Sequence, residues 1–298
     1  MKRSNALTTI MFFVVAILLM ATVALGIVTV IKNKANKNEV AQNVATPTPT
    51  ASVNIIPTQE VIARATATPT VAAIATPSST PTLSPTPHAT ICLDAGHQLE
   101  ADLNGEPVGP GADVNVERMR SVGAKNVVDG TMEYEWNMQM TDMVKDELRR
   151  RGYNVVLTRT SNDVNLSNKE RAEIANNAGA DIFVGIQADS YSDETVYGVY
   201  AEIPSDTNIY VGQYAKDSAE LAKAIQDSVV AATGAKSRSP QYRDSLAVIN
   251  WSKMPVCVMQ LGYMSNPDEA AKLASSEYQE KMVKAICDGI DAYFAGKN

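Results

Sequence analysis

Only one of the two histidines in this sequence, His97, stands where chemistry is expected. His88 lies in a Thr/Pro-rich stretch, whereas His97 follows directly after the apolar segment 89–95, with Gly96 allowing the chain to turn. An imidazole at the end of a strand can bind a metal ion or transfer a proton, although most such histidines only hydrogen-bond within a loop. The role of His97 therefore depends on the polar residues that accompany it.

Four segments follow one another over residues 90–295, namely LDAGH, EYEWN, VNLSNKERAEIANNAGADIFVGIQADS and NWSKMPVCVMQLGYMSNP. In this order and spacing they resemble the zinc-dependent N-acetylmuramoyl-L-alanine amidases of the amidase_3 type, which cut bacterial peptidoglycan. Each motif alone is a weak signal, and their common order makes the resemblance specific. The resemblance implies a single α/β domain with a mostly parallel central sheet and helices on both faces.

The resemblance assigns four positions of a catalytic centre. It implies that His97 and Glu133 are the first two zinc ligands, with Glu133 opening a long helix four residues before Asn137. Gln187 stands where the family has a third ligand, a histidine, and Gln260 stands where the family has the glutamate that acts as general base. Zinc seldom accepts a neutral amide oxygen. Glutamine cannot take up a proton at any useful pH.

These two exchanges predict a retained pocket with disabled chemistry. We expect zinc to bind weakly or not at all and amide hydrolysis to be weakened or lost, which leaves a pseudoenzyme or a regulatory module that binds the cell wall. The alternative is an active zinc amidase in which another carboxylate replaces the missing ligand. Asp189 is the candidate, because it lies two residues after Gln187 and therefore on the same face of a continuous strand.

A further alternative is an extracellular module that recognises glycan or stem peptide in the former substrate groove. Arg171 and Asn176 are then candidate substrate-binding residues, unless both pair within the protein. The segment 98–132, between His97 and Glu133, is expected to be a groove-side loop, because loops of this length are uncommon unless they are functional or disordered. Peptidoglycan is the expected partner in each case.

The elements that must position these residues alternate between strand-like and helical patterns, which is typical of an α/β domain. One helix is predicted over 132–152, because Trp136, Met140 and Leu148 fall on one helical face. A capping box formed by Ser167 and Glu170 starts another. Further helices are expected over 213–232, from Pro267, and up to about Phe294, and strands over 89–95, 153–158, 181–187, 196–203 and 254–261.

The N-terminal third predicts a membrane anchor and a spacer. Residues 10–31 carry no charge and, as a helix, are long enough to cross a hydrocarbon core of about 30 Å. They follow a short segment, 1–9, and precede a disordered Thr/Pro-rich linker, 32–89. We therefore expect a single-pass protein of the cell membrane whose amidase-like domain, residues 90–298, lies outside the cell.

The charge composition of this domain limits the classes of partner that it can bind. Of the 26 Lys/Arg and 33 Asp/Glu in the chain, residues 91–298 hold 20 and 31, so the domain is acidic. Nucleic acid is excluded as a partner, because such binding depends on Lys and Arg that neutralise phosphates. The three cysteines, Cys92, Cys257 and Cys287, lie in apolar segments and are expected to be buried thiols.

Overall fold

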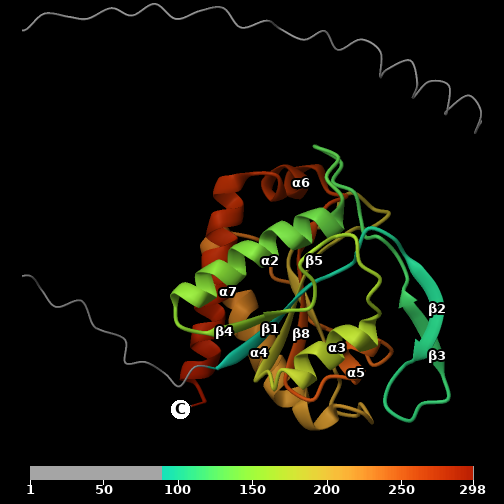
Figure 1. Cartoon of the computed structure of the whole chain (residues 1–298). Coiled ribbons are helices and arrows are strands. Elements are labelled where there is room, and N and C mark those ends of the chain that lie inside the picture. The colour runs from blue at the N-terminus through green and yellow to red at the C-terminus, as the bar shows by residue number, and fades with distance from the viewer. Residues whose placement is uncertain (1–88, 298) are drawn as a thin grey trace, which may run out of the picture. The chain divides into compact units, whose positions relative to one another are not determined.

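The computed structural model of the chain describes residues 89–297 (Figure 1). The predicted anchor, residues 10–31, and the linker up to residue 88 lie outside the described residues, so both stay predictions. Within residues 89–297, no helix is both long and apolar enough to cross a membrane.

A six-stranded sheet forms the centre of the domain. Its strands are β1 (Thr90–Ala95), β4 (Asn154–Leu157), β5 (Ile182–Asp189), β6 (Tyr200–Ile203), β7 (Gln241–Tyr242) and β8 (Val256–Tyr263). In the order β4-β1-β5-β8-β6-β7, the first four strands run parallel, β6 is antiparallel to β8, and β7 is parallel to β6. The sequence-based prediction of a mostly parallel sheet is therefore confirmed.

Helices cover both faces of this sheet, as Figure 1 shows for α7 on one side of the strands and for α3 and α5 on the other. Successive residues of β1 alternate between the two cores, since Ile91 and Leu93 pack with one buried cluster and Cys92 with the other. The first cluster includes residues of α2 (Glu133–Arg150), α4 (Ala215–Thr233), α6 (Pro267–Leu273) and α7 (Ser276–Ala295). The second includes residues of α3 (Asn168–Asn177) and α5 (Ala247–Asn250).

Local sequence signals account for several helix boundaries. The side chain of Ser167 accepts a hydrogen bond from the backbone N–H of Glu170, and the Glu170 carboxylate accepts one from the N–H of Ser167, as a capping box predicts. Asn266 caps α6, since its side-chain oxygen accepts from the backbone N–H groups of Asp268 and Glu269, with Pro267 in the first turn. A short 3₁₀ turn, η1 (Gly212–Tyr214), precedes α4. Gly289 lets α7 approach α4, because a Cβ atom there would lie 2.5 Å from the Cα of Ile225.

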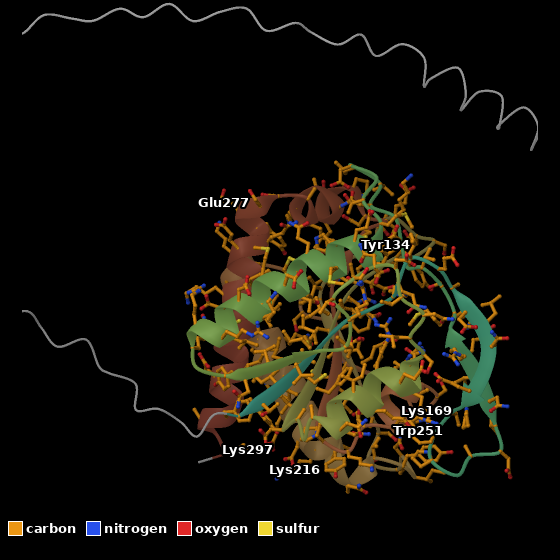
Figure 2. The ribbon with its side chains drawn as sticks, in the orientation of Figure 1. Tyr134, Lys169, Lys216, Trp251, Glu277 and Lys297 are labelled. Carbon is orange, nitrogen blue, oxygen red and sulfur yellow. The ribbon has the colours of Figure 1, made fainter. Side chains whose placement is uncertain are left out.

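The segment 98–132 is more ordered than the predicted loop. It contains an antiparallel hairpin of β2 (Asp102–Pro107) and β3 (Asn115–Met119). The hairpin is anchored on the α3–α5 side, because Trp251 Nε1 donates a hydrogen bond of 2.9 Å to the carbonyl of Pro107. Figure 2 shows Lys169 beside Trp251, and its Nζ lies 4.4 Å from the centroid of the Trp251 ring. The predicted groove-side position is borne out by residues 119–124, most of which line the hollow beside His97, whereas the hairpin was not predicted, because these short polar strands lack the apolar alternation that indicates a strand.

Candidate active site

The carboxyl ends of β1, β5 and β8 lie side by side and bring three predicted residues together. His97 follows β1, while Gln187 of β5 and Gln260 of β8 are register partners. With Glu133 from the first turn of α2 they line a hollow of about 510 Å³, which we call the His97 pocket. Such a position, outside the carboxyl ends of parallel strands, is where open α/β sheets bind ligands.

His97 is held in an unusual backbone conformation. Its φ angle of 61° is the one positive value for a residue other than glycine within the described part of the chain, and such a conformation costs about 1–3 kcal/mol. The ring Nδ1 donates to the carbonyl of Ser121 at 2.9 Å, and Nε2 lies 3.2 Å from Oε1 of Glu133. Burial lowers the pKa of the imidazole, but Glu133 and the Ser121 carbonyl together raise it above its usual value.

Glu133 is fixed by its neighbours in the loop before α2. Its Oε2 accepts a hydrogen bond of 2.6 Å from the backbone N–H of Ala124. Gly123, with φ of 88°, makes room for the carboxylate, since a Cβ atom there would lie 2.6 Å from Glu133 Oε2. Asn137, one turn later in α2, donates to the carbonyl of Gly96 at 3.0 Å. The loop before α2 and the end of β1 are thus tied together around the His97–Glu133 pair.

Arg171 lies beneath the pocket instead of lining it. Its side chain is only 1% exposed and donates to Asp94 Oδ1 at 2.8 Å, to the carbonyl of Ala95 at 2.9 Å, and to the carbonyl of His97 at 3.0 Å. All of these partners belong to the protein, so the structure gives Arg171 a supporting role in place of the expected substrate contact. Of the two alternatives left open by the sequence, pairing within the protein describes this residue.

Asn176 is also a structural residue. Its Nδ2 donates to the carbonyl of Trp251 at 2.8 Å, and its Oδ1 accepts from the N–H of Lys253 at 2.9 Å. These bonds tie α3 to the segment after α5, and Asn176 does not line the His97 pocket. Pairing within the protein, the alternative that the sequence left open, therefore describes Asn176 as well.

Arg159 is a supporting residue that the sequence did not reveal. It is buried and donates to the carbonyls of Ala95 at 2.7 Å, Gly96 at 3.2 Å and Tyr134 at 2.8 Å. Burial, together with the charge of Arg171, lowers its pKa to about 10. Two buried guanidinium groups therefore hold the turn on which His97 stands.

The two glutamines form a hydrogen-bonded pair. Gln260 Nε2 donates to Gln187 Oε1 at 3.0 Å, across adjacent strands. The pair packs against the turn after β1, because a Cβ atom at Gly96 would lie 2.3 Å from Gln187 Nε2. Gln260 Oε1 is buried and has no hydrogen-bond partner among residues 89–297. The two positions that the family uses for a ligand and a base therefore hold neutral amides that face each other.

Asp189 lines the same pocket but is already engaged. A register shift separates it from Gln187 in the pairing of β5 with β8. Its Oδ1 accepts a hydrogen bond of 2.7 Å from the N–H of Ser190, and its Oδ2 accepts one of 2.6 Å from the hydroxyl of Tyr200. Ser190 and Tyr200 therefore hold the Asp189 carboxylate in its present orientation, while each of its oxygens keeps a further lone pair.

Comparison with known proteins decides the family. The profile of the N-acetylmuramoyl-L-alanine amidases, Amidase_3, matches residues 91–292. The chain belongs to this amidase family. The resemblance seen in the sequence motifs is thereby confirmed, and the relatives below share the same domain.

Two curated relatives come from Bacillus subtilis. An uncharacterised protein, YqiI, is 31% identical over 210 residues, which are 70% of this chain and 87% of YqiI. The N-acetylmuramoyl-L-alanine amidase LytC is 31% identical over 166 residues, which are 56% of this chain and 32% of LytC. Among solved structures, the apo form of the amidase Ami1 from Mycobacterium abscessus matches with a TM-score of 0.62 at 26% identity, over 69% of this chain and 98% of that chain.

The donor set of this amidase-family member does not match a three-ligand zinc site. His97 and Glu133 are suitable ligands, and their Nε2 and Oε1 atoms lie 3.2 Å apart. Within residues 89–297, however, no group of three His, Cys, Asp or Glu side chains is placed to hold a metal ion. At the third position, the oxygen of Gln187 accepts from Gln260. The residues present therefore do not fit the zinc centre that the family resemblance implies.

Two further charged residues of the pocket were not predicted. Glu202 of β6 is buried within reach of the Gln260 side chain, and Arg243, just after β7, places its Nε 3.2 Å from Glu202 Oε1. Burial raises the pKa of the Glu202 carboxyl, although Arg243 opposes the shift. A lone glutamate in the otherwise apolar segment 196–203 indicates that Glu202 needs a partner, since a charge in a buried strand is rarely left unpaired, but it does not identify Arg243 as that partner.

Proposed function

We propose that this protein binds peptidoglycan in the pocket of an amidase that has lost, or nearly lost, hydrolysis of the muramoyl–L-alanine amide. The observation that carries the proposal is the hydrogen bond between Gln187 and Gln260. It fills the sites of one zinc ligand and of the general base with two neutral amides. The His97–Glu133 pair and the turn that supports it are retained.

The chemistry of amide hydrolysis explains why both exchanges matter. The attacking water must lose a proton, and a positioned base contributes about 10²–10⁴-fold to the rate of such a step. Gln260 has no basic group, and its Nε2 is committed to Gln187. A pocket with two ligands and no base is suited to binding, and we propose that zinc is weakly bound or absent.

The cellular setting is part of the same proposal. We propose that residues 10–31 anchor the protein in the cell membrane with the amidase-family domain outside, and that the linker 32–89 lets the domain reach the wall. The acidic balance of the domain supports a partner other than nucleic acid.

One observation favours an active enzyme as second candidate. Asp189 lines the His97 pocket, so release of the Tyr200 hydroxyl would free a carboxylate near His97 and Glu133. In that case the unmodified protein takes up zinc tightly and hydrolyses peptidoglycan, and Asp189→Asn abolishes both. Metal content of the two proteins, measured by elemental analysis, separates this candidate from the binding protein.

The repair of both amide positions tests the proposal. Gln187→His restores the ligand and Gln260→Glu restores the base, and we expect neither alone to release stem peptides from purified sacculi, because water activation needs both groups. The double variant is expected to release them, and His97→Ala in the double variant is expected to stop the release. Robust release of stem peptides by the unmodified protein, lost in His97→Ala, would contradict the proposal.

A further inference from the structure

A second hollow, of about 510 Å³, lies beside the hairpin of β2 and β3 and adjoins the His97 pocket. We call it the hairpin hollow. The two share four wall residues, namely Arg120, Asn168, Arg243 and Leu246. Because the walls are shared, a ligand in the His97 pocket can extend into the hairpin hollow.

Arg243 stands at this junction in a fixed position. Its backbone N–H donates to the carbonyl of Ile203 at 2.9 Å, beside the pairing of β6 with β7. Its Nε lies 3.2 Å from the buried Glu202 carboxylate. Its two Nη groups have no hydrogen-bond partner among residues 89–297, and the side chain is 46% exposed. Glu202 therefore holds one edge of the guanidinium and leaves the other edge for a ligand.

Arg120 supplies a second guanidinium to the same wall. It follows β3, is 89% exposed, and has one ionic partner, Glu117, whose Oε2 lies 3.6 Å from its Nε. A guanidinium binds a carboxylate through two parallel N–H···O bonds, which an ammonium group cannot do. The domain as a whole is acidic, with 20 Lys/Arg against 31 Asp/Glu in residues 91–298, so general attraction of anions does not account for two arginines here.

We propose that Arg243 and Arg120 bind a free carboxylate of a peptidoglycan stem peptide in the hairpin hollow, while the sugar end of the ligand lies in the His97 pocket. This rests on the proposed function and adds which part of the ligand is recognised. A stem peptide is a short chain whose free carboxylates lie several bonds from the sugar, whereas the repeating disaccharide without its peptide carries only the lactyl carboxylate on the sugar ring itself, which would lie in the His97 pocket. Glu202 is a positioning residue for the carboxylate, since its own carboxylate holds Nε of Arg243.

Calorimetric titration of the full chain tests the subsite with two probes. One is an N-acetylmuramoyl tripeptide with free carboxylates, and the other is the same compound with its carboxylates converted to amides. We expect the amidated probe to bind about tenfold more weakly or worse, because it loses a charge-assisted bidentate pair. Arg243→Gln is expected to abolish the difference, and Arg243→Lys to restore only part of it.

Matched variants separate recognition from folding. Arg150→Gln, at the far end of α2 from Glu133, removes an exposed arginine and is expected to leave both affinities unchanged. Because Arg243→Gln leaves Glu202 buried without its cation, Glu202→Gln combined with Arg243→Gln provides a second form of the same test. Arg120→Gln changes only an exposed side chain and is expected to weaken the acidic probe alone.

Several outcomes would overturn the subsite. Equal affinity for the two probes would do so, as would binding of the disaccharide without peptide at the same strength. Failure of both probes to bind, in a protein that still sediments with sacculi, would overturn the carboxylate subsite and leave the proposed function standing. Failure to sediment with sacculi would overturn the proposed function itself.

Discussion

Two neutral amides meet at positions 187 and 260, and their pairing links the two exchanges. Gln260 donates the hydrogen bond and Gln187 accepts it. A substitution at either position therefore changes the hydrogen-bond partner of the amide at the other. The two glutamines therefore act as one unit in the pocket. His97 beside them keeps a strained backbone conformation with a positive φ angle, which is typical of functional sites.

The burial of Glu202 allows a prediction of how thermal stability depends on pH. Burial, opposed by Arg243, raises the pKa of this carboxyl above its model-compound value of 4.5. A carboxyl with a higher pKa in the folded chain destabilises the fold as pH rises through the window between its unfolded and folded pKa values. Glu202→Gln is therefore expected to raise the thermal midpoint near pH 7 and to change it little below about pH 4.

Thermal unfolding at several pH values checks this, with Glu117→Gln as control, because Glu117 is half exposed. A midpoint that falls in Glu202→Gln near pH 7 would show that the ion pair with Arg243 outweighs the cost of burial.

Residues of the pocket could be predicted from the sequence only where they belong to a recognisable motif. His97 and Glu133 could be assigned to one site because both stand in family motifs, and in the structure His97 Nε2 lies 3.2 Å from Glu133 Oε1. Glu202 and Arg243 lie 41 positions apart, and their contact depends on pairing of the two short strands β6 and β7. No periodicity announces a two-residue strand, so this pair could not be predicted.

At the scale of elements, Arg171 joins α3 to the end of β1. Its guanidinium is buried against Asp94, which also accepts a hydrogen bond of 2.5 Å from the Thr158 hydroxyl. Arg171→Gln leaves Asp94 without its cation, and removal of one partner of a buried ion pair costs about 3–5 kcal/mol. We expect a loss of this size in the free energy of unfolding, measured by urea denaturation.

Arg149→Gln is a suitable control for Arg171→Gln, because this exposed arginine makes one side-chain hydrogen bond, to the carbonyl of Val155. Unchanged stability of Arg171→Gln, with weaker binding to sacculi, would return Arg171 to the substrate-binding role that the sequence suggested.

Elements were predictable where one face is apolar. The helices α2, α4 and α7 and the buried strands β1, β5 and β8 carry clear apolar patterns and were found close to their predicted places. The hairpin DLNGEP and NVERM was not, because most of its residues are polar and its outer face meets solvent. Its anchoring by Trp251 and Glu106 comes from contacts between distant segments, which a sequence pattern does not show.

For the whole molecule, the proposal predicts an exposed domain on a long tether. Protease added to intact cells or protoplasts is expected to release a fragment that begins between Thr46 and Thr90, because a segment so rich in Thr and Pro is not expected to form a core that would protect it. The released fragment is identified by mass spectrometry of its N-terminus. Protection of residues 90–298 in intact cells, and digestion only after lysis, would contradict the outward orientation.

The central claim is that the pocket binds peptidoglycan without cleaving the amide. The most direct measurement is mass spectrometry of stem peptides released from purified sacculi by the unmodified protein with zinc added, with LytC as the active control. We expect the protein to bind sacculi and to release no more stem peptide than buffer alone does, since Gln187 and Gln260 supply neither a zinc ligand nor a general base. Release by the unmodified protein that disappears in His97→Ala would contradict it.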